Sequence, residues 1–140
     1  MVPLSRRVYL WSARAFLASV VAQVFFIGLY LFAGFDLGLH FLGALIVTIV
    51  ALELVILAFA ARLDTRSKQW IGLLFVLTIV QGILPGLKDS ISFVAALHPV
   101  NALVLFWLGL VVLRDAHAYE RAPAAVSQNE RAASAEAPSA

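Results

Sequence analysis

The chain has 140 residues, of which 63% are hydrophobic and 13% are charged, and its formal net charge at pH 7 is +2. Because soluble domains carry about 25% charged residues, this composition, with a mean hydropathy of +0.97, excludes a water-soluble globule and predicts an integral membrane protein. The small positive charge does not indicate nucleic acid binding. The absence of cysteine excludes disulfides, thiolate metal sites and a covalently attached c-type haem.

Four long apolar runs predict four transmembrane helices, at about 9–33, 40–62, 69–86 and 97–114. Apart from Glu53, the charged residues lie at or near the ends of these runs. A hydrocarbon core of about 30 Å requires about 20 helical residues, and continuous apolar character favours helices over a barrel. We interpret the first run as a retained helix and not as a cleaved signal peptide. The predicted fold class is all-α, an integral membrane four-helix bundle occupying residues 1–114.

The basic residues predict the orientation of these helices. Nine of the ten lysines and arginines fall on one side, and only Lys88 falls on the other. The positive-inside rule then predicts that both termini are cytoplasmic in a multi-pass protein of the inner (cytoplasmic) membrane. Residues 115–140 are rich in Ala, Ser, Pro and Glu, and we expect them to form a disordered cytoplasmic tail.

The sequence repeats itself after a shift of 58 residues. Gln23 then aligns with Gln81 and His40 with His98, so that the spacing from glutamine to histidine is 17 residues in both halves. Each half is predicted to be a helical hairpin that starts from the cytoplasm. The bundle is therefore expected to consist of two tandem hairpins in a parallel repeat.

The two repeated histidines are the predicted site. His40 begins the second helix and His98 begins the fourth, so both are expected near the outer leaflet. The second and fourth helices would be diagonal in a square bundle, with their axes roughly 12–14 Å apart. Two imidazoles facing one another across such a diagonal suit the centre of a haem better than a bare ion. Small or polar neighbours would make room for the macrocycle: Gly43, Ala44, Gln81, Asn101 and Ala102. Alternatively, the small residues only pack helices and the histidines face water or headgroups.

Glu53 is a second candidate because carboxylates within a membrane are usually functional. It lies 13 residues beyond His40 on the same helix. It is expected either to belong to a proton path or to form an ion pair with Arg14, and we favour the ion pair.

The stretch "VQGILPGLKDSISFVAALHPVNALVLFWLGLVVL", residues 80–113, resembles a helix pair of the haem A synthase family. The resemblance covers about residues 8–114, and the chain also looks like small four-helix bacterial membrane proteins. That family has two four-helix halves with histidines on their second and fourth helices, and His40 and His98 match those positions in one half. The acidic motif of the family's oxidising half and the external cysteine pair of some members are missing here. The resemblance therefore implies a haem site but not haem A synthesis.

The leading hypothesis is a membrane cytochrome that binds one b-type haem between His40 and His98 for electron transfer. Its partners would be the lipid bilayer and a membrane redox partner or quinone, and a homo-oligomer is also considered. One alternative is a non-enzymatic membrane subunit or scaffold without haem. Another is a small transporter that uses Glu53. Whether the protein is an enzyme is left open.

Overall fold

The computed structural model describes the backbone of residues 4–136 and the side chains of residues 4–121, and every regular element in this part is helical. The elements follow in the order α1 (Leu4–Ala33), α2 (Gly38–Ala60), α3 (Thr65–Ile83), η1 (Leu84–Leu87), α4 (Ser92–Ala95) and α5 (Leu97–Glu136). Four of the segments are long and apolar enough to cross a membrane. The predicted all-α fold with four transmembrane helices is confirmed.

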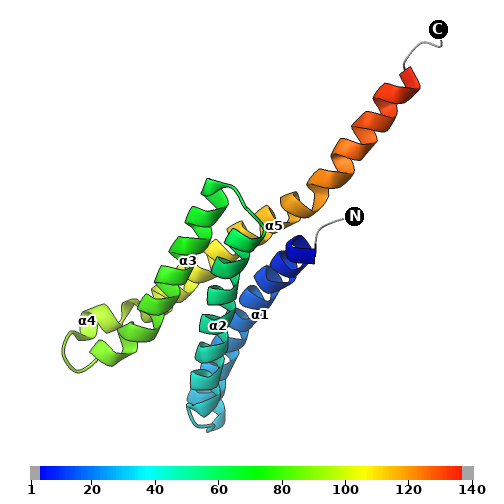
Figure 1. The fold of residues 1–140 in the computed structure, drawn as a ribbon. Helices are drawn as coiled ribbons and strands as arrows, with labels where there is room; N and C mark the ends of the chain where they lie inside the picture. Colours follow the sequence, from blue (N-terminus) through cyan, green and yellow to red (C-terminus); the bar gives the residue numbers. More distant parts are fainter. Residues whose placement is uncertain (1–3, 137–140) are drawn as a thin grey trace.

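The four long helices form two hairpins that pack against each other. Helix α1 packs on α2 and α5, and α3 packs on the same two helices, which leaves α2 and α5 diagonal to one another. The start of α1 and the C-terminal part of α5 lie toward one end of the bundle, here called the terminal end (Figure 1). The α1–α2 link, η1 and α4 lie at the opposite end, here called the histidine end. The hairpins cross and diverge toward the histidine end.

Local sequence explains where the helices stop. The α1–α2 link begins at Gly34, whose φ of +73° is a left-handed conformation that glycine adopts without strain. At the terminal end, the Asp64 side chain caps α3 by accepting a hydrogen bond of 2.8 Å from the Ser67 amide. Helix α3 gives way to the 3-10 turn η1 at Pro85, which has no amide hydrogen to continue the helix.

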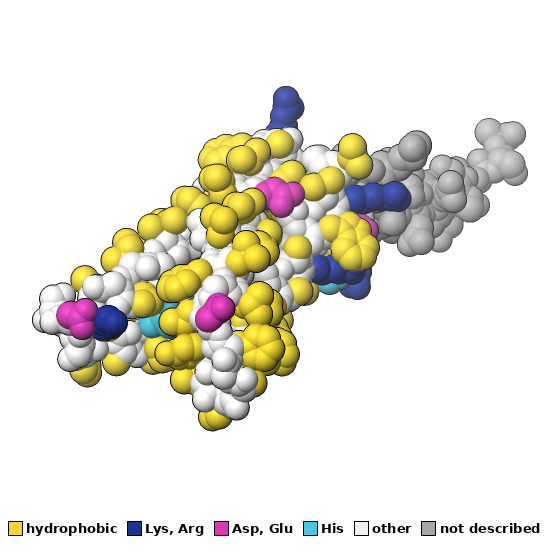
Figure 2. Space-filling view, turned by 90° about the horizontal axis from the view of Figure 1, so that it is seen from below, with side chains coloured by type: hydrophobic (Ala, Val, Ile, Leu, Met, Phe, Trp, Pro, Cys, Tyr) yellow, Lys and Arg dark blue, Asp and Glu magenta, His cyan; other side chains and the backbone are white. Residues whose placement is uncertain are grey.

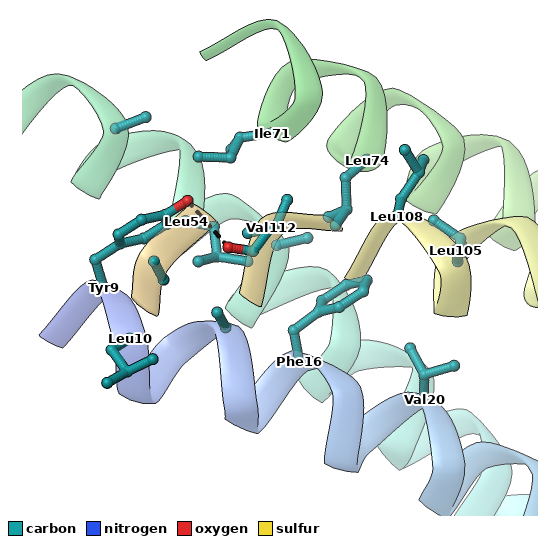
Figure 3. Packing of buried hydrophobic residues seen from close by; sticks show 14 of the residues in the cluster. Tyr9, Leu10, Phe16, Val20, Leu54, Ile71, Leu74, Leu105, Leu108 and Val112 are labelled. Carbon is teal, nitrogen blue, oxygen red and sulfur yellow. Dashed lines mark hydrogen bonds between the residues drawn. The ribbon is translucent and has the colours of Figure 1, made fainter. Parts of the chain in front are cut away.

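The buried core lies in the terminal half and the middle of the bundle. Tyr9 and Phe16 extend from α1 toward Val112 and Leu108 of α5, and all four side chains are almost fully buried (Figure 3). The Tyr9 hydroxyl, which would be costly to bury alone, donates to the Val112 carbonyl at 3.4 Å and to the Asp115 carboxylate at 3.2 Å.

The repeat is visible in the packing. Most residues buried in the first hairpin correspond, after the 58-residue shift, to residues buried in the second. In α1 and α3 the matched pairs are Tyr9 and Ser67, Ala13 and Ile71, Phe16 and Leu74, and Val20 and Thr78. In α2 and α5 they are Val47 and Leu105, Ala51 and Gly109, Leu54 and Val112, and Ala58 and Ala116. Each hairpin therefore turns the same face to the core, as expected for two tandem copies.

Most of the outer surface is apolar. Hydrophobic side chains cover the middle of the molecule in Figure 2, and basic side chains gather over the half nearer the terminal end. Large apolar residues such as Phe32 (89% exposed) and Phe93 (79% exposed) point outward. Such an apolar surface is costly in water, which is consistent with the predicted contact with a bilayer.

The structure extends α5 beyond the boundary predicted at residue 114. The helix continues to Glu136, so the described part of the expected disordered tail is helical. Ala116 is fully buried in the core. The Tyr119 hydroxyl donates to the Asp64 carboxylate at 2.7 Å and accepts the Asp64 amide at 2.8 Å. The segment after residue 114 is polar and has no apolar periodicity, so nothing in the sequence indicated a longer helix. The contacts of Ala116 with the core and of Tyr119 with Asp64 in the α2–α3 link account for the longer helix.

The contact of α1 with α5 should be sensitive to the size of residue 109. A Cβ atom at Gly109 would lie 2.8 Å from a methyl carbon of Leu17 and 3.2 Å from the ring of Phe16, whereas one at Gly28 would meet nothing within 4 Å. We expect Gly109→Ala to be less stable than Gly28→Ala by about 1–3 kcal/mol, since both gain the same helix propensity. Unfolding in mixed micelles measures the difference. Equal stabilities would contradict the close packing.

The cap at Asp64 should make stability depend on pH. The Ser67 amide, followed by the Tyr119 hydroxyl, lowers the pKa of the Asp64 carboxyl below its ordinary value of 3.8. The stabilisation is therefore complete above the unfolded-state pKa and is lost as the pH falls from about 4 through the lower folded-state pKa. Unfolding measured from about pH 6 to about pH 2, roughly two units on either side of the ordinary pKa, should show this loss. Asp64→Asn should remove that component of the pH dependence.

Candidate metal-binding histidine pair

His40 and His98 meet at the histidine end, on the two diagonal helices. Their ring centroids are 6.3 Å apart and the ring planes are inclined by 62°. Helices α2 and α5 do not pack on each other, so the two side chains reach toward one another across the bundle. The sequence prediction that these two residues approach one another is therefore correct.

His98 is held by Gln81, and Pro85 explains how. In a continuous helix the amide of residue 85 would bond to the carbonyl of residue 81, but proline has no amide hydrogen. The Gln81 carbonyl is thus free, and it lies 3.0 Å from Nδ1 of His98. The imidazole satisfies a carbonyl that would otherwise be unpaired in an apolar environment.

Side-chain amides complete the surroundings of His98. Nε2 of the Gln81 side chain lies 3.2 Å from Nε2 of His98. Asn101 donates to the Gln81 side-chain oxygen at 2.8 Å and to the Leu77 carbonyl at 2.9 Å. These contacts are mutually consistent when Nδ1 of His98 carries the proton and Nε2 has the free lone pair. That tautomer leaves Nε2 able to accept either an amide hydrogen or a metal ion.

The surroundings of His40 are poorer in partners. The Gln23 carbonyl lies near the ring, but α1 continues through this level, so that the Ile27 amide uses this carbonyl in the helix. Nδ1 of His40 and both side-chain polar atoms of Gln23 are buried without a hydrogen-bond partner among the described residues. The position equivalent to Asn101 is Gly43, which has no side chain to offer.

The small residues predicted to make room for a macrocycle differ in their surroundings. Gly43 is buried directly beneath the side chains of Gln23 and Phe26, so its missing Cβ serves the contact of α1 with α2. Ala44 is exposed, and Ala102 and Asn101 are half-buried. Asn101 acts through Gln81, and sequence reasoning had not assigned it a hydrogen-bonding partner.

The spacing of the two rings fits a single metal atom between them. With metal–nitrogen bonds of about 2 Å and ring centres about 1 Å behind each nitrogen, opposed imidazoles on one metal have centroids roughly 6 Å apart. Within residues 4–121 no group of three or more His, Asp or Glu side chains gathers around a common point. Two imidazoles leave the remaining coordination positions to another group, and a porphyrin supplies four nitrogens.

The ion pair predicted between Glu53 and Arg14 is not formed. The Glu53 carboxylate accepts a hydrogen bond of 2.9 Å from the Ser12 hydroxyl. The Arg14 guanidinium instead lies over the Trp11 ring, 4.7 Å from its centroid, and 3.2 Å from Nε2 of His117. The two residues lie at comparable depth, as expected, but the rotation of α1 about its axis brings Ser12 rather than Arg14 to Glu53. Depth can be read from sequence, and this rotation cannot.

Comparison with known proteins found no matching family model, no matching curated protein and no matching solved structure.

Gln81 makes hydrogen bonds with His98 and Asn101, whereas the Gln23 side chain makes none, and replacing each glutamine tests this difference. We expect Gln81→Leu to lower stability by about 1–2 kcal/mol because Asn101 and His98 lose their partner. Gln23→Leu should be neutral or stabilising, since it removes two buried polar atoms that make no hydrogen bond. Unfolding of both variants in the same micelles makes the comparison. An equal loss in both would show that the two environments do not differ as described.

Proposed function

We propose that the protein is a membrane cytochrome in which His40 and His98 are the axial ligands of one b-type haem. The observation that carries the proposal is the approach of two imidazoles, 6.3 Å between centroids, from diagonal helices. The sequence resemblance of residues 80–113 to a helix pair of the haem A synthase family is in line with this proposal. When bound, such a haem would be held by His40 and His98 and would supply single-electron transfer.

The residues around His98 are suited to orient an axial ligand. Metal-bound histidines usually donate their second ring N–H to a carbonyl or carboxylate, which fixes the tautomer and increases the basicity of the ligand. The Gln81 carbonyl is in position to accept the proton of Nδ1. On haem binding, the NH₂ group of Gln81 would have to leave Nε2 of His98. The hydrogen bond that Asn101 donates to the side-chain oxygen of Gln81 would keep the rest of the amide near the imidazole.

The proposal includes an orientation in the membrane. Arginine and lysine side chains concentrate toward the terminal end, which by the positive-inside rule is the cytoplasmic end in an inner membrane. The histidine pair would then lie near the outer leaflet. A membrane-embedded redox protein or a quinone could exchange electrons there.

A non-enzymatic subunit or scaffold is the second candidate, and one observation favours it. Both ring nitrogens of His98 already have partners within the chain, so this histidine is satisfied without a metal. In that reading the histidine pair stabilises the divergent end of the bundle. The protein would then be colourless and would lose stability when His98 is replaced.

Absorption spectroscopy separates these two functions. Protein expressed with ample haem and purified in mild detergent should show a Soret band. His40→Ala and His98→Ala should each lose or strongly shift this band, because each removes one axial ligand. His117→Ala is the matched control, since His117 lies at the terminal end against Arg14 and its loss should leave the spectrum unchanged.

A wild-type protein without a Soret band would contradict the haem site. An unchanged spectrum in both His40→Ala and His98→Ala would do the same. A colourless protein whose stability falls in His98→Ala would instead support the scaffold.

A further inference from the structure

A groove on the outside of the first hairpin lies far from the histidine pair. It is an open depression of about 480 Å³ between α1 and α2, lined by residues that include Arg7, Val8, Trp11, Ser12, Ala15 and Glu53. Arg7 and Trp11 are exposed, and Glu53 is half-buried. The groove therefore brings a cation, an aromatic ring and an anion together on a surface that otherwise faces lipid.

The residues at the level of this groove are of the kind found at the edge of the hydrocarbon region. The hydrogen bond from Ser12 puts the Glu53 carboxylate at the level of Ser12 on α1. Trp11 and Arg14 lie at the same level, and tryptophan and arginine are residues that anchor helices at the membrane interface. A proton path through the middle of the membrane is therefore a poorer explanation of Glu53 than contact with lipid headgroups.

The charge of Glu53 has no cationic partner in the described part of the chain. Its hydrogen bond there comes from the neutral Ser12 hydroxyl, and the nearby Arg14 is engaged with Trp11 and His117. A half-buried carboxylate is costly unless a positive group approaches it. The groove is open to lipid, so such a group can come from the bilayer.

We propose that this groove binds the headgroup of a phospholipid that carries a primary ammonium. The ammonium donates hydrogen bonds to Glu53, the phosphate pairs with Arg7, and the apolar part of the lipid follows Val8 and Ala15. Arg7 and Glu53 line the same groove, and the phosphate and ammonium of this headgroup are joined by two carbons, so one lipid molecule would bridge the two residues.

Hydrogen bonding gives the groove a preference among headgroups. A primary ammonium has three donors for a carboxylate, whereas a choline headgroup has none and can only contact the face of Trp11. An anionic glycerol headgroup would be attracted by Arg7 and repelled by Glu53. Ethanolamine lipids should therefore bind better than choline or glycerol lipids.

Native mass spectrometry of the full chain, released from bilayers with equal amounts of ethanolamine, choline and glycerol phospholipids, tests this proposal. The wild type should retain the ethanolamine lipid in about three- to tenfold excess over either competitor, as expected for a charge-assisted hydrogen bond at a partly exposed site. Glu53→Gln should bring ethanolamine and choline lipids to parity. Asp36→Asn, at the exposed carboxylate of the α1–α2 link, is the matched control and should keep the preference.

A second measurement uses only the wild type and so does not depend on a variant that folds. Ethanolamine lipids with zero, one, two or three N-methyl groups should be retained in falling order, because each methyl removes one donor. Equal retention across this series, or a preference unchanged in Glu53→Gln, would overturn the proposal. Preference for the glycerol lipid that disappears in Arg7→Gln would also overturn it, since it would mean that the groove recognises anions alone. None of these outcomes depends on whether haem is bound.

Discussion

The carbonyl of Gln81 has to be satisfied inside an apolar bundle, and its helical partner is a proline. In water this carbonyl would bind solvent, but within a membrane each backbone polar group needs a partner in the protein. The Nδ1 atom of His98 is that partner, at 3.0 Å. Pro85 ends α3 and leaves this carbonyl free. The bond from His98 then connects α3 to the start of α5, sets the tautomer of His98 and places its Nε2 atom beside the Gln81 side-chain amide.

The two hairpins repeat the same helical pattern, but the residues around their histidines form different hydrogen bonds. In the second, Asn101 and Gln81 surround His98 with hydrogen bonds. In the first, the equivalent of Asn101 is Gly43, α1 runs on without a proline, and the Gln23 side chain remains unpaired. The copy with the proline holds its histidine firmly, and the copy without it holds its histidine through packing. The two hairpins thus bury many equivalent positions in the core but differ in what surrounds their histidines.

Much of the fold was predictable because it follows from one-dimensional patterns. The four spans follow from long apolar runs, and the hairpin repeat follows from the match of Gln23 with Gln81 and of His40 with His98. The approach of the two histidines followed from that repeat. By contrast, the partners of Glu53 and of Tyr119 depend on the rotation of each helix about its axis, which lipid-facing sequences barely encode because their apolar residues surround the whole helix. The neighbours of Gly43 were not predictable either, since a missing side chain does not reveal which residue packs against it.

Because the hairpins diverge toward the histidine end, a small change in the angle between them produces a larger displacement at the histidines. Its rigid core lies toward the terminal end, and Leu54 in that core is 14 residues from His40 along α2, which is about 21 Å of helix. A change of about 3° in the angle between the hairpins would therefore move the two imidazoles relative to one another by about 1 Å, half the length of a metal–nitrogen bond. A change of this angle at the terminal end would therefore change the distance between the two rings at the histidine end, without any contact with either ring.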